Sequence, residues 1–203
     1  MCLIDYCTPF LYPIKMIRSF NTSQTQIIKD IIQLHIPTGR FDLDPTYSKG
    51  NFYKSGEVLE PVYKFDKNPV TSDVVYSDSK ELPLLNETVS SIIYDPPFII
   101  AGGVESKIKA RFSSYPNWEL LKQDYYNSLK EFYRVLSDKG VLVVKCQNTI
   151  SSGKQHQTAY FVIKSALELG YNVKDEFILL SNKKMLGYNW NRQLHASSYC
   201  SKV

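Results

Sequence analysis

An aspartate, two prolines and an aromatic ring stand together at Asp95-Pro96-Pro97-Phe98, directly after the apolar residues 91–94. The β-branched run predicts a buried strand, and the prolines end it because each lacks an N–H and has a fixed φ. Open α/β sheets bind ligands at the carboxyl ends of strands, where Asp95 is expected. A carboxylate, a free carbonyl of the stiff Pro-Pro turn and a flat ring can hold a planar group that bears an exocyclic amine. The alternative is a turn that ends a strand and buries Phe98.

Three more short strands are expected to end in an acid. Together the four strands cover residues 41–44, 62–66, 74–78 and 91–95, and their last residues are Asp44, Asp66, Asp78 and Asp95. The breaks between them favour a parallel sheet. One aspartate at a strand end is usually a turn former. Four in succession predict that several carboxyl ends line one crevice.

Helical periodicity marks three other stretches, at residues 24–36, 117–136 and 155–169. Ser23 and Gln26 form a capping-box pattern before the first helix, and Gly170 is placed to end the third. Strands are expected at 141–144, 177–180 and 196–201, and a basic loop at 99–117. No repeat, linker or low-complexity segment interrupts the chain. We therefore expect one domain over residues 1–203, with an N-terminal extension and helix at 1–40 and a core at 41–203.

The composition bounds the class of protein. The 203-residue chain is 43% hydrophobic and 22% charged, as is ordinary for a globular protein. No apolar run approaches the roughly 20 residues of a membrane span, and the N-terminus lacks a basic secretory start. Four scattered cysteines predict a reducing, intracellular and hence cytoplasmic location, and three distant histidines form no local metal motif. The net charge of +4 is compatible with a polyanionic partner.

This order of elements and motifs resembles the class I AdoMet-dependent methyltransferases, specifically the N6-adenine and N4-cytosine type that modifies exocyclic amines of bases. The hallmark of that type is Asp/Asn/Ser-Pro-Pro-aromatic, here residues 95–98. Its cofactor loop commonly reads Asp-Pro-x-x-Gly-x-Gly, here residues 44–50, with Ser48 where a glycine is usual. That departure puts a Cβ where the loop approaches the cofactor.

The resemblance covers roughly residues 20–200 as an ordered set. It implies a three-layer, Rossmann-like α/β fold with a mostly parallel seven-stranded sheet and helices on both faces. The last strand of that sheet is expected to be antiparallel. Residues 41–203 would then form the catalytic core of a single methyltransferase domain.

The resemblance also implies S-adenosyl-L-methionine (AdoMet) as the cofactor, and no metal. The residues that it assigns to the cofactor are Asp44, Thr46 and Gly50 of the loop, Asp66 for the ribose hydroxyls, Asp78 for the adenine, and Asn21 and Ser23 near the carboxylate. Each acid has an alternative role in a surface turn, and Ser79 can replace Asp78. Asn21 and Ser23 can simply cap a helix.

On the substrate side, Asp95 and the Pro96 carbonyl can accept both hydrogens of an amine, while Phe98 stacks on the base. The further residues expected to face the substrate are Lys145 and Gln147 at the end of the fifth strand, Lys107 and Arg111 in the basic loop, and Trp190 and Arg192 in the tail. Lys145 can instead reach solvent. The tail interleaves charge with rings as single-strand binders do, but Trp190 can also pack on the sheet.

The expected function is methyl transfer from AdoMet to an exocyclic amine of a nucleic-acid base, with N6 of adenine in DNA favoured. Three alternatives remain open, namely an RNA adenine or N4-cytosine methyltransferase, a silent nucleic-acid-binding partner subunit, and a small-molecule N-methyltransferase. The chain offers no large recognition region. A protein partner or a homo-oligomer is therefore a further expectation.

Overall fold

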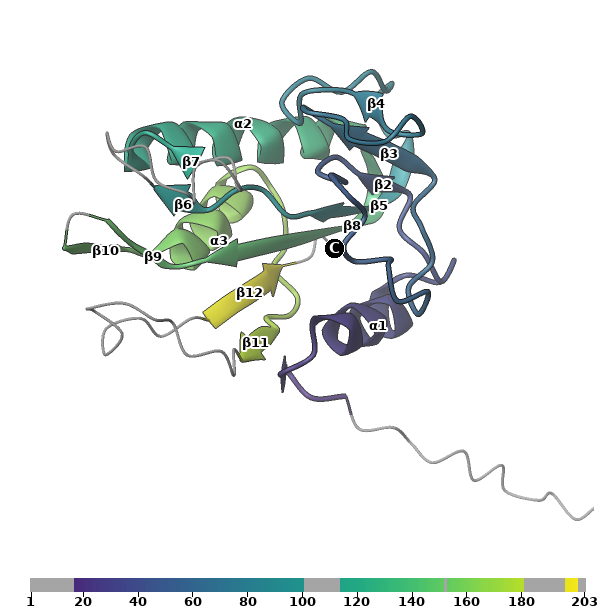
Figure 1. Cartoon of the computed structure of the whole chain (residues 1–203), viewed down its shortest axis with the longest axis horizontal. Coiled ribbons are helices and arrows are strands. Elements are labelled where there is room, and N and C mark those ends of the chain that lie inside the picture. The colour runs from purple at the N-terminus through teal and green to yellow at the C-terminus, as the bar shows by residue number, and fades with distance from the viewer. Residues whose placement is uncertain (1–16, 101–113, 152, 181–195, 201–203) are drawn as a thin grey trace, which may run out of the picture.

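The computed structural model describes residues 17–100, 114–151, 153–180 and 196–200 (Figure 1). The helices are α1 (Gln24–His35), α2 (Trp118–Val135) and α3 (Thr158–Glu168). The strands are β1 (Phe20–Asn21), β2 (Leu43–Asp44), β3 (Tyr63–Asp66), β4 (Val75–Tyr76), β5 (Val89–Tyr94), β6 (Ile99–Ile100), β7 (Ser114–Tyr115), β8 (Leu136–Gln147), β9 (Thr149–Ser151), β10 (Lys154–His156), β11 (Ile178–Leu180) and β12 (Ala196–Cys200).

One sheet forms the centre of the fold, with the strand order β1-β11-β12-β8-β5-β2-β3-β4. The five strands from β8 to β4 are parallel to one another, as predicted. β12 is antiparallel to both β11 and β8, which confirms the expected antiparallel last strand. The described sheet has eight strands rather than seven because the two-residue β1 adds itself to the free edge of β11.

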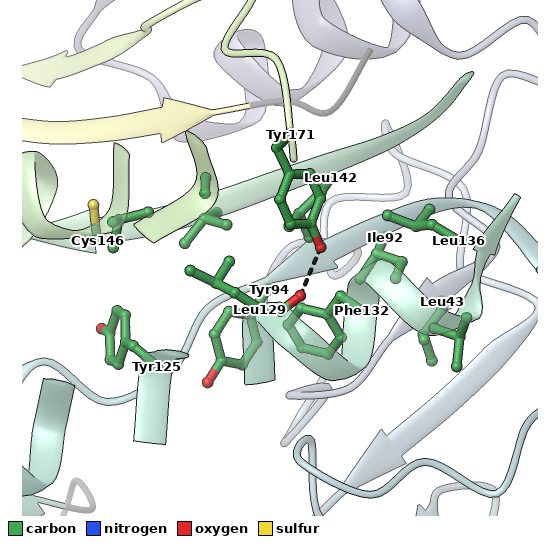
Figure 2. Packing of buried hydrophobic residues seen from close by; sticks show 14 of the residues in the cluster. Leu43, Ile92, Tyr94, Tyr125, Leu129, Phe132, Leu136, Leu142, Cys146 and Tyr171 are labelled. Carbon is green, nitrogen blue, oxygen red and sulfur yellow. Dashed lines mark hydrogen bonds between the residues drawn. The ribbon is translucent and has the colours of Figure 1, made fainter. Parts of the chain in front are cut away.

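The two faces of the sheet carry separate hydrophobic cores, because side chains alternate along each strand. Ile92 and Tyr94 pack on one face with α2 and α3, whereas Ile93 packs on the other face with the isoleucines of α1. The expected three layers are therefore present, and Figure 1 shows α2 and α1 on opposite sides of the strands. Figure 2 shows the first core, where the hydroxyl of Tyr171 donates to the Leu129 carbonyl at 2.7 Å.

The helix ends follow the predicted signals with two exceptions, one of which is that the helix expected from residue 155 begins at Thr158, because Lys154–His156 form β10. The Ser23 hydroxyl accepts from the Gln26 N–H at 3.2 Å, and Gly170 ends α3 with a φ of 95°. The reciprocal half of the capping box is not formed, since the Gln26 amide donates to Asp30 at 2.7 Å. Asn21 takes its place and accepts from the Ser23 N–H at 2.9 Å. The backbone N–H groups of Ser23 and Gln26 at this helix start are thus both satisfied by side chains.

Two small β-ribbons lie beside the carboxyl edge of the main sheet and were not predicted. β6 and β7 pair in parallel, while β9 and β10 form an antiparallel hairpin that turns at Gly153. The root of this hairpin lies against β6, so it lies next to the segment that follows Phe98. Within the described ranges, no helix is both long enough and apolar enough to span a membrane.

Candidate active site

Asp95 lies directly after β5, at the carboxyl end of a central strand. Its N–H donates to the hydroxyl of Thr46 at 2.9 Å, and its Oδ2 accepts from Lys145 Nζ at 2.8 Å. Because Tyr94 pairs with Val144, the next residues Asp95 and Lys145 lie side by side on β5 and β8. Lys145 is therefore paired with Asp95 rather than reaching solvent. The Asp95 side chain keeps 26% of its surface exposed.

Two opposing effects act on the charge of Asp95. Burial raises the pKa of this carboxyl, and the nearby Lys145 ammonium lowers it. Burial is the larger effect, so the pKa stays above its ordinary value. An ion pair at 2.8 Å nevertheless favours the carboxylate, because a protonated Asp95 would leave the lysine charge unpaired in a mostly buried place.

The two prolines differ in their surroundings. Pro96 is buried, and among the described residues no hydrogen bond reaches its carbonyl. The carbonyl of Pro97 accepts from the Tyr125 hydroxyl at 3.1 Å, which fastens the turn to α2. Phe98 is only partly buried and belongs to neither core, unlike the ring of a strand-ending turn that packs inside. Among the described residues, the turn thus engages the Pro97 carbonyl and keeps Phe98 out of both cores.

Asp44 is a second carboxyl at this edge, at the end of β2, and only 1% of it is exposed. Its Oδ1 accepts from the Thr46 N–H at 2.9 Å, and its Oδ2 accepts from the Tyr53 hydroxyl at 2.9 Å. Burial raises the pKa of Asp44 to about 7, and the charge of Asp95 adds to the rise. The Thr46 hydroxyl connects the Asp44 carboxyl to the backbone of Asp95, since it donates to Asp44 Oδ1 at 3.3 Å and accepts from the Asp95 N–H.

The loop after β2 turns sharply at two residues. Ser48 has a φ of 51° and Gly50 a φ of 62°, both in the left-handed region. A Cβ on Gly50 would stand 2.6 Å from the hydroxyl oxygen of Tyr47, so this glycine is required by space as well as by conformation. Ser48 adopts the conformation that a glycine adopts without strain. Its N–H donates to Asp66 Oδ2 at 2.7 Å.

Asp66 is the last residue of β3, whereas Asp78 follows the neighbouring β4 by two residues, since that strand ends at Tyr76 rather than at Asp78 as predicted. Asp66 fastens the loop, since Oδ1 also accepts from the Asn68 N–H at 2.7 Å. Asp78 accepts from Lys67 Nζ at 2.8 Å. Burial alone would raise the pKa of Asp78, but Lys67 and Lys80 outweigh it and lower this pKa. Both acids are partly exposed and are therefore accessible at the same edge as Asp44.

Other predicted residues lie elsewhere. Asn21 and Ser23 serve the start of α1, and no contact within the described chain joins them to Asp44 or Asp95. Gln147 ends β8 opposite Ser197 of β12. Lys107, Arg111, Trp190 and Arg192 lie outside the described residues. The predicted roles of all these residues in binding the cofactor or the substrate therefore remain predictions.

Three aromatic residues of this edge were not predicted from the sequence. Tyr53 holds Asp44, Tyr125 holds the Pro97 carbonyl, and the ring centre of Phe52 lies 5.4 Å from Lys145 Nζ. The only sequence signal was an aromatic-rich segment after Gly50. In the part of the chain that the structure describes, no group of three His, Cys, Asp or Glu side chains is arranged to hold a metal ion.

No protein-family model and no curated protein sequence matches the chain. Several solved structures match it by fold. A candidate DNA modification methylase from Thermus thermophilus matches 62% of this chain at 12% identity, with a TM-score of 0.45. The match covers 51% of that methylase, so the chain spans about half of its length.

Two further structures match most of the chain. A geranyl diphosphate methyltransferase in complex with SAM matches 89% of this chain and 84% of its own, at 8% identity and a TM-score of 0.54. The cyclase SpnF matches 87% and 80%, at 11% identity and a TM-score of 0.53. The described chain therefore has the α/β fold of class I methyltransferases. Because one neighbour is a cyclase, this fold alone does not define a reaction.

Proposed function

We propose that the protein is an AdoMet-dependent methyltransferase that acts on an exocyclic amine of a nucleic-acid base, with N6 of adenine in DNA favoured. One arrangement carries the proposal. Asp95, fixed by Thr46 and Lys145, stands beside the Pro96 carbonyl and the partly exposed Phe98. Together they offer two hydrogen-bond acceptors and a ring face at the carboxyl edge of the sheet.

These groups suit an aromatic amine, whose lone pair is delocalised into its ring and makes a poor nucleophile. Asp95 Oδ1 and the Pro96 carbonyl would each accept one amine hydrogen and so turn the lone pair toward the methyl donor. Phe98 would stack on the base. Acceptors fixed in advance help most where positive charge develops on the nitrogen during the reaction. The proton that the product amine loses would pass to water at the exposed edge of Asp95.

The donor set fits AdoMet in its chemistry. Asp66 ends β3 and Asp78 follows the neighbouring β4, and both are partly exposed carboxylates, suited to accept from ribose hydroxyls and from an adenine amine. The backbone of the loop around Ser48 and Gly50 is held in left-handed conformations next to Asp44. When bound, AdoMet supplies a methyl group on a positively charged sulfur. Asn21 and Ser23 are proposed to lie near the carboxylate of the cofactor.

Adenine is favoured over cytosine because an aspartate heads the tetrapeptide, an argument from the resemblance. The base must leave any duplex to reach Asp95, which costs least in single strands or at mismatches. Lys107, Arg111, Trp190 and Arg192 remain proposed contacts to the polymer, with DNA favoured over RNA. A protein partner or a second copy of the chain would supply any sequence recognition.

The test is transfer of labelled methyl from AdoMet to single-stranded DNA, duplex DNA and RNA. We expect label on the polymer with the wild type and a loss of at least about a hundredfold with Asp95→Asn, as is typical when a group that stabilises developing charge is removed. Asp138→Asn is the matched control, because Asp138 is exposed at the opposite end of β8. Equal transfer by Asp95→Asn would contradict the role of Asp95.

A failure of transfer has three distinguishable outcomes. Retained AdoMet binding without transfer would indicate a missing partner protein or a different acceptor. Loss of both would favour a silent nucleic-acid-binding subunit. Binding of AdoMet without binding of any oligonucleotide would favour a small-molecule substrate.

A further inference from the structure

Lys145 has two partners at the proposed site. Its Nζ lies 2.8 Å from Asp95 Oδ2 and 5.4 Å from the centre of the Phe52 ring. Only 16% of its side chain is exposed. A lysine that serves a phosphate of a polymer keeps its ammonium in solvent, whereas this side chain is mostly buried and its ammonium is paired with Asp95. The sequence pattern predicted instead that Lys145 faces the substrate itself.

We propose that Lys145 is a positioning residue, whose ammonium holds Oδ2 of Asp95, keeps this carboxylate charged, and leaves Oδ1 to accept from the substrate amine. The inference rests on the proposed function and deepens it. Among the described residues, no hydrogen bond reaches Oδ1, while Oδ2 is occupied by Lys145. One oxygen is thus fixed by the protein and the other is left for a ligand.

The surroundings of Asp95 explain why a cation is needed there. From β2, the buried carboxyl of Asp44 accepts from the Thr46 hydroxyl, which in turn accepts from the backbone N–H of Asp95, and the charge of Asp95 raises the pKa of Asp44. From α2, Tyr125 contributes a neutral hydroxyl that is engaged by Pro97. From β8, Lys145 supplies the positive charge. Without it, burial alone would favour a protonated Asp95, which has lost acceptor capacity.

Phe52 and Asp95 together fix where the ammonium lies. The ring face attracts the cation from one side, and the carboxylate attracts it from another. Tyr53, the next residue, binds Asp44, so the same loop segment holds both the partner of Asp44 and the ring against Lys145. Lys145 therefore acts on the reaction through Asp95.

The experiment compares Lys145→Met and Lys145→Arg with the wild type across pH. Lys164→Met is the control, since Lys164 is an exposed α3 residue and its loss changes the net charge equally. The low-pH limb of kcat/KM for methyl transfer should move to higher pH in Lys145→Met, because a carboxylate that has lost its cation protonates more readily. The expected shift is about one to three pH units. Transfer on the acid limb then falls about tenfold or more and recovers as pH rises.

Lys145→Arg should restore the wild-type profile, because it keeps a cation within reach of Asp95. The titration of the Asp95 carboxyl, followed by ¹³C NMR in the same variants, provides a readout that needs no activity. A pH-independent loss in Lys145→Met, with an unchanged Asp95 titration, would overturn the inference and would indicate direct substrate contact. An Asp95 titration that moves as expected, in a protein that methylates no polymer, would support the ion-pair role and count against the proposed function.

Discussion

Replacement of Asp44 by Asn should change how the stability of the protein depends on pH. Asp44 is buried and has a pKa of about 7 in the folded chain, against about 3.9 in an unfolded one. Between these values the folded state binds a proton that the unfolded state has released, so the free energy of unfolding falls as pH rises. At about 1.4 kcal/mol per pH unit, this one group removes on the order of 2–4 kcal/mol between pH 4 and pH 7.

Asn keeps the shape of the side chain and an oxygen that accepts from Thr46, while its amide can donate to the Tyr53 hydroxyl. Below pH 4 the variant and the wild type should have similar stability. Near pH 8 the variant should be more stable by the amount above. Urea unfolding followed by circular dichroism at several pH values measures the free energy of unfolding of both proteins. The titration of all other groups cancels when the two values are subtracted. If the difference in unfolding free energy between variant and wild type stays constant from pH 4 to pH 8, Asp44 does not have a raised pKa in the folded chain and the reasoning is refuted.

Three further substitutions test the geometry of the same edge by urea unfolding. Thr46→Val leaves the Asp95 N–H without its acceptor and should cost about 1–3 kcal/mol, whereas Thr46→Ser should cost less; equal costs would argue against the hydroxyl link. Gly50→Ala should cost more than Gly39→Ala, since both have positive φ but only Gly50 lacks space for a Cβ; equal losses would contradict the packing of this loop. Ser48→Gly relieves a left-handed conformation and should stabilise the fold by up to about 1 kcal/mol; a clear loss of stability would show that the serine side chain has a role of its own.

The fold was predictable where hydrophobic patterning and chain breaks agreed. The acids that end the expected strands identified the carboxyl edge of the parallel sheet, because parallel strands bring those ends together. The helix expected from residue 117 is α2, and the Asn117 side chain caps it by accepting from the Leu120 N–H at 2.9 Å. The fully apolar run at residues 141–144 proved to be the centre of β8, next to β5.

The missed elements are short and polar. β10 has the sequence Lys-Gln-His, without the alternation that signals a strand, and β1 has two residues that owe their conformation to the edge of β11. Tertiary contacts of this kind cannot be read from local pattern. The pairing of Asp44 with Tyr53 is similar, because the loop between them determines that the hydroxyl reaches the buried carboxyl.

The most direct test of the central claim is to digest the methylated polymer to nucleosides and identify the product by mass and chromatography. We expect N6-methyladenine with the wild type and its loss with Asp95→Asn, because the proposed role of Asp95 is to accept from the exocyclic amine. N4-methylcytosine would contradict the choice of adenine but would still support methyl transfer to an exocyclic amine. A methyl group on a ring carbon, a ring nitrogen or a ribose oxygen would contradict the central claim.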